Sequence, residues 1–358
     1  MKAHYDVLDG LRGTAALAIV LFHIFEMLFD ADHAPMPHAF LAADFFFALS
    51  GFVVGYAYEA RLKQGMGFAA FARRRLIRLH PVVLVAASWG LIGWLIDPFV
   101  GDKQTVGVAI SAGQLALIFV LSLFLLPSPT LPNEYGETHS INGPSWTLFQ
   151  EYLANIFYGL FGYRMGLKLH IALCIAASAA LALTAHRLGW LGCGWQWEYF
   201  WVAPIRMAAP FLMGLLVFRL GWRVKIPHAW VLLSVLLIAV LSLPKLGAFN
   251  GVFEAACVVF VFPLILAAGA GTGKATAGMA GKLCRFVGQL SYPVYIIHYP
   301  LIYIFGHWVW STGPARPTLL LAAGLLYAVE IGLGVLLLYA YDLPLRAWLA
   351  KKFLAKTA

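Results

Sequence analysis

Long apolar segments recur along the whole chain and are separated by short polar loops. Each segment is roughly 20 residues long, the length that a helix needs to cross a hydrocarbon core about 30 Å thick. The apolar positions are continuous and lack the alternation of a membrane β-barrel. Since the backbone must pair its own polar groups within lipid, the pattern predicts helices. Eleven such segments are predicted, at residues 11–30, 39–58, 78–97, 105–126, 144–163, 169–188, 200–219, 228–246, 250–270, 287–310 and 317–340.

The charges in the loops predict how these segments cross the membrane. Residues 59–78 form the most basic stretch, and the tail after residue 345 is basic as well. Because Lys and Arg accumulate in cytoplasmic loops, we expect both termini on the cytoplasmic side of the inner (cell) membrane. Residues 127–143 carry Glu134 and Glu137 and no Lys or Arg. Their charge favours the extracytoplasmic side.

Two cytoplasmic termini require an even number of crossings, so one of the eleven segments should fail to span. Segment 105–126 begins with the polar residues Thr105, Ser111 and Gln114, which makes it the best candidate for a re-entrant or interfacial piece. We therefore predict an all-α transmembrane helix bundle of about ten spans with one irregular segment. Residues 1–358 are expected to form a single integral-membrane domain.

The composition excludes an ordinary soluble domain. Hydrophobic residues make up 62% of the chain and charged residues 11%, whereas charged residues make up about a quarter of a soluble domain. The net charge of +9 comes from the loops, so it reflects topology and predicts a lipid bilayer, with no nucleic acid, as the partner. The four cysteines lie far apart without CxxC spacing. Neither a metal site nor a disulfide is predicted.

An ionisable side chain inside an apolar segment is costly to bury and often marks a functional site. His23 lies in the first segment, roughly 18 Å from the cytoplasmic face. Glu151, in PSWTLFQEYLANIFYG, lies roughly 20 Å from the same face if residues 127–143 are extracytoplasmic. The two side chains can therefore share one depth. We predict a His–carboxylate pair suited to general-base chemistry or to a proton relay.

Other polar residues in the apolar segments each have a structural alternative. His298 lies at mid-depth of its segment, where an interhelical hydrogen bond would explain it equally well. Ser50, next to Gly51, can serve close helix packing or bond to its own helix. Glu26 lies near the end of the first segment, where snorkelling to the interface is expected. The role of Arg12, at the other end, stays open.

The loop FARRRLIRLHP concentrates positive charge at the cytoplasmic mouth of a helix, with Arg74, Arg75 and Arg78 among its arginines. Guanidinium groups bind phosphate oxygens in a bidentate manner, so the loop is a candidate anion site. The alternative is that this charge only sets the topology.

Five motifs together resemble the acyltransferase-3 family of integral-membrane acyltransferases, which O-acylate sugars of bacterial envelopes and other secreted glycans. The motifs are LDGLRGTAALAIVLFH at 8–23, DFFFALSGF at 44–52, RRLIRLHP at 74–81, WTLFQE at 146–151 and LSYPVYIIHYP at 290–300. They occur in the order of the family and extend over nearly the whole chain. The chain resembles the stand-alone members, which lack a hydrolase-like periplasmic domain.

The resemblance implies an O-acyltransferase that moves an acyl group from cytoplasmic acyl-CoA to a carbohydrate or glycolipid hydroxyl on the extracytoplasmic side. Acetyl is the expected acyl group. It implies that His23 is the catalytic histidine, that Arg12 belongs to the same site and that Glu151 is the motif carboxylate. It also implies that acyl-CoA is handled by three arginines, Arg74, Arg75 and Arg78.

In this interpretation His23 is the general base and Glu151 orients it. Ser50, Trp146 and His298 are expected near the substrate, and oxyanion donors are sought among Arg12, Ser50 and Trp146. An acyl-imidazole intermediate is a second route. The alternative from another class is a proton-coupled secondary transporter that uses His23, Glu151 and His298 as a relay.

Overall fold

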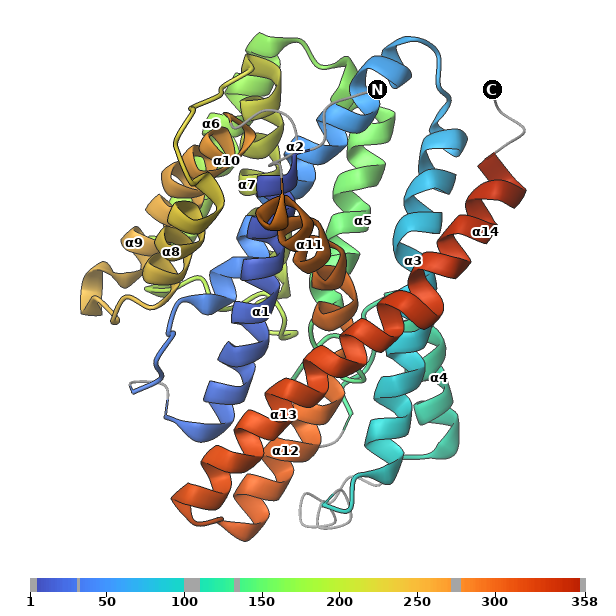
Figure 1. The fold of residues 1–358 in the computed structure, drawn as a ribbon, viewed down its shortest axis with the longest axis vertical. Helices are drawn as coiled ribbons and strands as arrows, with labels where there is room; N and C mark the ends of the chain where they lie inside the picture. Colours follow the sequence, from blue (N-terminus) through green and yellow to red (C-terminus); the bar gives the residue numbers. More distant parts are fainter. Residues whose placement is uncertain (1–4, 31–32, 100–109, 132–135, 272–277, 355–358) are drawn as a thin grey trace.

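The structure, a computed structural model, describes residues 5–30, 33–99, 110–131, 136–271 and 278–354. Every regular element in these ranges is helical, and no β-strand occurs within them (Figure 1). The predicted all-α fold is confirmed. The α-helices are α1 (Asp6–Leu28), α2 (Ala42–Lys63), α3 (Phe68–Ile96), α4 (Ala112–Leu123), α5 (Ser145–Leu160), α6 (Leu167–Leu188), α7 (Ala203–Leu220), α8 (Ala229–Leu241), α9 (Asn250–Ala256), α10 (Phe262–Gly271), α11 (Met279–Ile297), α12 (Tyr299–Thr312), α13 (Arg316–Leu337) and α14 (Leu343–Leu354).

Short 3-10 and π-helical pieces connect several of these helices. The 3-10 turns are η1 (Ala39–Leu41), η3 (Gly162–Arg164), η4 (Phe200–Val202) and η5 (Gly247–Phe249). Two π-helical turns, η6 (Cys257–Val261) and η7 (Leu338–Asp342), join α9 to α10 and α13 to α14. As a result α13 and α14 form one long rod, drawn in red across Figure 1.

Seven helical stretches of the described residues are long and apolar enough to cross a membrane, at Asp6–Leu28, Ala39–Lys63, Phe68–Ile96, Leu167–Leu188, Phe200–Leu220, Gly247–Gly271 and Arg316–Leu354. Large apolar side chains on several of them are exposed, for example Leu321, Leu325 and Leu336 on α13. A surface of this kind is stable in lipid and unfavourable in water. The protein is therefore an integral membrane protein, while the count of about ten spans stays a prediction.

The described part of segment 105–126 contains the short helix α4. The side chain of Ser111 accepts a hydrogen bond from the N–H of Gln114, and the side chain of Gln114 accepts one from the N–H of Ser111. This reciprocal pair is a capping box, which satisfies two of the free donors at a helix start. Two of the three polar residues that suggested an irregular segment are thus a helix cap, and Thr105 lies outside the described residues.

The single span predicted at 287–310 is interrupted. It divides into α11 and α12, which meet at His298. Pro300 has no N–H to donate to the carbonyl of Ile296, four residues back. That carbonyl instead accepts a bond of 2.6 Å from the side chain of Asn142. A loop residue therefore satisfies the group that the proline leaves free.

Glycines allow two pairs of helices to pack closely. Helix α1 lies along α11, and α2 lies along α7. A Cβ atom on Gly51 would lie 2.0 Å from the carbonyl oxygen of Phe211, and one on Gly214 would lie 1.9 Å from that of Ala48. No side chain fits at such distances. The packing role that the sequence offered for the region of Ser50 and Gly51 is thus filled by Gly51.

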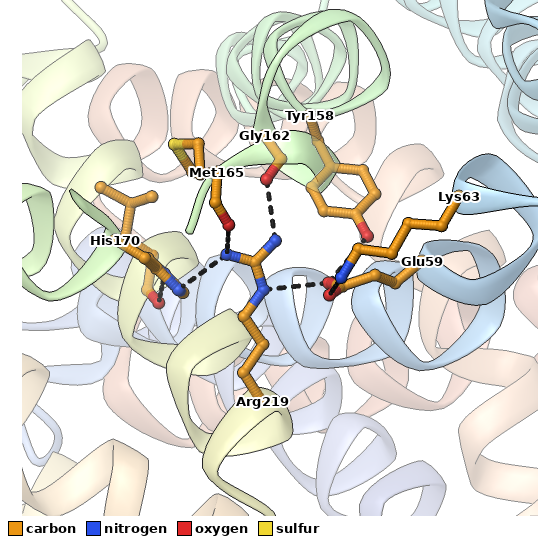
Figure 2. A network of polar contacts seen from close by, with 8 residues as sticks. Glu59, Lys63, Tyr158, Gly162, Met165, His170 and Arg219 are labelled. Carbon is orange, nitrogen blue, oxygen red and sulfur yellow. Dashed lines mark hydrogen bonds and ion pairs between the residues drawn. The ribbon is translucent and has the colours of Figure 1, made fainter. Parts of the chain in front are cut away.

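A buried arginine at the end of α7 connects this helix with α2, α6 and the 3-10 turn η3, as Figure 2 shows. Arg219 donates to Glu59 of α2 at 3.0 Å and to the carbonyl oxygens of Gly162 and Met165 at 2.8 and 3.2 Å. It also donates to Nδ1 of His170 at 3.1 Å, so that histidine carries its proton on Nε2 and donates to Leu212. Every guanidinium nitrogen has a partner, which offsets the cost of burying the charge.

Candidate active site

A His–carboxylate pair lies on one face of α1. His23 and Glu26 are three residues apart and therefore one helical turn apart. Their Nδ1 and Oε2 atoms are 2.6 Å apart. Because a carboxylate only accepts, Nδ1 donates, and the neutral imidazole keeps a lone pair on Nε2. Both side chains line a cavity of about 550 Å³, so the geometry is that of a general base with an orienting carboxylate.

A second histidine supports the ring of His23. The rings of His23 and His298 are stacked with centroids 5.3 Å apart, and the ring of Tyr299 meets His23 edge-on at 4.8 Å. Nδ1 of His298 donates to the carbonyl oxygen of Tyr295 at 2.8 Å. His298 is fully buried and does not line the large cavity. The structure places this predicted substrate residue behind His23, where it fixes the position of the imidazole.

Three arginines line a second, smaller cavity of about 150 Å³. Arg12, Arg75 and Arg78 belong to its lining, together with Ser50 and Glu151. Arg12 donates to Ser291 Oγ at 2.9 Å and to the carbonyl oxygen of Gly288 at 2.6 Å. These bonds fix α1 against α11 and aim the guanidinium along the cavity wall.

The expected pairing of His23 with Glu151 is wrong. Glu151 Oε1 accepts from Arg75 at 2.7 Å and from Ser50 at 3.0 Å. His23 is instead paired with Glu26, which the sequence analysis expected to snorkel. The two residues lie in different cavities, Glu151 with Arg12 near the start of α1 and His23 near its end, so the single depth expected for them is wrong as well. A fixed guanidinium is the partner that balances the buried carboxylate.

Arg74 does not join the other two arginines. Its Nη1 donates to the carbonyl oxygen of Ala70 in its own helix at 3.0 Å, and it does not line either cavity among the described residues. Arg75 and Arg78 are three residues apart on α3 and face the smaller cavity together. The structure thus divides the arginines that the sequence grouped.

The large cavity has aromatic walls and a buried ion pair at its side. Trp146, Trp190 and Trp195 line it. Arg206 also lines it; its guanidinium lies 5.2 Å from the ring centroid of Trp146 and pairs with Asp44, and both charged side chains are almost fully buried. Arg206 was not among the predicted site residues, although a charge inside the apolar segment 200–219 is the same signal that singled out His23.

The acidic loop expected outside the membrane is folded into the protein in its described part. Glu137 lines the large cavity and accepts from Tyr303. His139 is buried and bonds to the carbonyl oxygen of Leu125 at 3.0 Å. Burial lowers the pKa of His139 to about 4, because the charged form cannot be hydrated there. This loop therefore forms part of the cavity wall.

Within the described residues, no group of three or more His, Cys, Asp or Glu side chains is arranged to hold a metal ion. The candidate site comprises two cavities, one lined by His23 and Glu26 and one lined by arginines. A family model described as an acyltransferase domain matches residues 5–339. The chain belongs to the acyltransferase-3 family. The resemblance seen in the five motifs is confirmed.

Two curated proteins are similar to this member of the acyltransferase-3 family. "Acyltransferase MdmB" of Streptomyces mycarofaciens is 28% identical over 375 residues, which cover 90% of this chain and 89% of that protein. "Protein 2 in picA locus" of Rhizobium radiobacter is 36% identical over 188 residues, which cover 51% of this chain and 94% of that protein. No solved structure matches the chain. The family membership makes this protein a membrane-embedded acyltransferase.

Proposed function

We propose that the protein transfers an acyl group from cytoplasmic acyl-CoA to a hydroxyl of a carbohydrate or glycolipid on the extracytoplasmic side. Acetyl is the acyl group that we favour. The proposal rests mainly on the position and hydrogen bonding of His23. Its Nδ1 is held by Glu26 at 2.6 Å, and it lines a cavity of about 550 Å³ with its other ring nitrogen unpaired. A positioned base with a lone pair can take the proton of a hydroxyl as that oxygen attacks.

The smaller cavity suits the donor. Its lining contains three guanidinium groups, Arg12, Arg75 and Arg78, and two carboxylates, Asp9 and Glu151, so it favours an anion. Its volume of about 150 Å³ is below the roughly 300–1,000 Å³ of sites that enclose a drug-sized ligand. We infer that it holds the acyl-pantetheine arm and that the nucleotide phosphates lie at its mouth, near the basic start of α3.

The larger cavity suits the acceptor. Indole rings offer flat apolar faces to the C–H faces of a sugar, and Trp146, Trp190 and Trp195 line this cavity. Asn250 and Glu254 lie in the same lining, where the Asn250 amide donates to Glu254 at 2.6 Å. The amide can also donate to a hydroxyl oxygen, and the carboxylate can accept from a hydroxyl group. The combination of aromatic walls and a few polar side chains is typical of a site that orients a polyhydroxy ligand.

The two cavities lie along opposite halves of α1. Leu8, Asp9 and Arg12, near its start, belong to the smaller cavity, and His23 and Glu26, near its end, belong to the larger one. The basic residues at the start of α3 place the first end in the cytoplasm by the positive-inside rule. This orientation, with both termini cytoplasmic in the inner membrane, brings the donor from the inside and the acceptor from the outside.

In the transfer step Nε2 of His23 takes the proton of the acceptor hydroxyl, and the oxygen attacks the carbonyl carbon of the thioester. The C–S bond then breaks, and the CoA sulfur leaves and receives the proton from the imidazolium. In the acyl-imidazole route the same Nε2 attacks first. Trp146, which lines the same cavity as His23, is the proposed donor to the developing oxyanion, whereas Arg12 and Ser50, expected in this role from the sequence, line the other cavity.

The test is loss of radiolabelled acetyl-CoA with purified protein in nanodiscs, with and without a crude envelope glycan fraction. His23→Ala should abolish turnover. The matched control is His33→Ala, because His33 forms the same type of pair with Asp30 at 2.6 Å but is exposed on the surface. Equal rates in wild type and His23→Ala would refute the base. No thioester loss at all would favour the proton-coupled transporter, which is assayed by substrate flux into sealed vesicles.

A further inference from the structure

The two cavities share one wall. Three residues belong to the lining of both, namely Ala43 of α2, Thr147 of α5 and Tyr295 of α11. The cavities therefore meet where these three helices come together. His23 lies on one side of this wall and the arginines Arg12 and Arg75 lie on the other.

Tyr295 contributes the largest side chain of the shared wall. Ala43 contributes only a methyl group on a helix. The hydroxyl hydrogen of Thr147 is used in a bond of 2.8 Å to the carbonyl oxygen of Pro144. Since Thr147 has no second hydrogen, the Tyr295 hydroxyl donates to Thr147 Oγ1, at 2.9 Å. The phenol is held by this one neutral hydrogen bond, by ring contacts with Phe46 and His298 at centroid distances of 5.4 and 6.0 Å, and by packing against the apolar core.

The backbone around Tyr295 is short of helical hydrogen bonds. Pro293 precedes it by two residues, and the break between α11 and α12 follows at His298. Prolines remove donors from the helix and allow it to bend. The carbonyl oxygen of Tyr295 also accepts from His298, whose ring is stacked on His23. A shift of Tyr295 would therefore move His298 and, through the stacked rings, His23.

The proposed reaction requires a passage through this wall. A hydroxyl oxygen and a thioester carbon react only when they approach to about 3–3.5 Å. If the arginines hold the donor in one cavity and His23 activates the acceptor in the other, the thioester has to pass the shared wall before it reacts.

We propose that Tyr295 is the gate between the donor and acceptor cavities. Its phenol, bonded to Thr147, closes the wall at rest and swings aside to admit the acyl thioester toward His23. The proposal rests on the proposed function for its purpose, but the wall itself is tested without any acyl transfer.

The experiment measures access to the smaller cavity from each face of the membrane. A cysteine replaces Ser50, which lines only that cavity, in a chain whose four native cysteines are changed to alanine or serine. A charged methanethiosulfonate reagent that does not cross lipid is added to sealed vesicles of either orientation. With Tyr295 intact, labelling is expected from one face only.

Tyr295→Ala should open the wall, because removal of a large buried side chain leaves a cavity, and labelling from the second face should rise by roughly tenfold or more. Tyr295→Phe keeps the ring and should stay close to one-sided. Phe52→Ala is the matched control, since Phe52 is a fully buried aromatic residue of the same helix as Ser50 and lines neither cavity. It should leave labelling one-sided.

One-sided labelling in Tyr295→Ala would overturn the gate, as would two-sided labelling with Tyr295 intact. Labelling from the first face verifies that each variant is folded, and Tyr295→Leu replaces the alanine variant if that signal is lost. Two-sided labelling of Tyr295→Ala, together with no consumption of acetyl-CoA by the wild-type protein, would support the gate and refute the proposed function. Consumption of acetyl-CoA by the wild-type protein, together with one-sided labelling of Tyr295→Ala, would overturn the gate and leave the proposed function in place.

Discussion

Replacing Glu26 by Gln tests the pair that the structure places on α1. The substitution keeps the shape of the side chain and removes its charge. In the wild type the carboxylate holds the proton of His23 on Nδ1, at 2.6 Å, and leaves Nε2 free. A neutral amide can also donate to Nδ1, which would put the proton on Nε2 and block its use as a base.

The size of the effect follows from the charge that develops on His23. When the imidazole takes a proton, the imidazolium and the carboxylate attract each other by ~4 kcal/mol at a charge separation near 4 Å and an effective dielectric constant of about 20. The side chains are 17% and 39% exposed, so water screens most of this attraction and leaves about 1 kcal/mol. That loss corresponds to a rate of transfer lower by roughly fivefold.

The assay is single-turnover loss of acetyl-CoA at saturating donor, with Glu151→Gln as the comparison. Glu151 is paired with Arg75 in the smaller cavity, so its substitution should change the apparent affinity for the donor more than the rate. In a His23→Ala background, Glu26→Gln should have no further effect, because the two residues act as a unit. A rate near wild type for Glu26→Gln, or a selective rate loss for Glu151→Gln, would refute the reasoning.

Three further predictions concern stability in detergent. Arg206→Met should lower the free energy of unfolding by about 3–5 kcal/mol, because it leaves the buried carboxylate of Asp44 unpaired, and the addition of Asp44→Asn should restore part of it. Gly214→Ala should lower the melting temperature, since its Cβ would lie 1.9 Å from a carbonyl oxygen, whereas Gly324→Ala, with nothing within 4 Å, should not. Burial lowers the pKa of His139 from 6.5 to about 4, so the unfolded chain binds the proton more readily between these values. The contribution of His139 to stability should therefore be fully present above pH ~6.5, and the free energy of unfolding should fall by about 3 kcal/mol as the pH drops toward 4. Thermal unfolding measured as a function of pH tests this dependence, and His139→Gln should weaken it.

The sequence by itself determined the class of the protein. Length and hydropathy of a segment are local properties, and an apolar run in lipid has to form a helix because its backbone has no other partners. The family was also visible in the sequence, since its motifs are short strings in a fixed order. His23 and the arginines of α3 could be singled out because a charge in an apolar setting is evident from its neighbours alone.

The tertiary structure decided which of these residues meet. A count of residues from a segment end shows neither where the helix lies in the bundle nor which way a side chain points, because the direction of a helical residue rotates by about 100° at each step. Glu151 therefore lies with Arg75 in a different cavity from His23, and Arg74 turns back to its own helix. The partner of His23 could have been found, because Glu26 lies one turn away on the same helix, but its position near the segment end suggested the interface instead.

The wall between the cavities forms only when distant parts of the chain pack together. Thr147 and Tyr295 are 148 residues apart in the chain and meet through one hydrogen bond. Both residues lie in motifs of the family, WTLFQE and LSYPVYIIHYP, but nothing in either segment shows that the two side chains meet. The break at His298 likewise depends on the side chain of Asn142, which satisfies the carbonyl that Pro300 leaves free. Local sequence specifies helices and buried charges, whereas the contacts that separate donor from acceptor arise only when distant helices pack together.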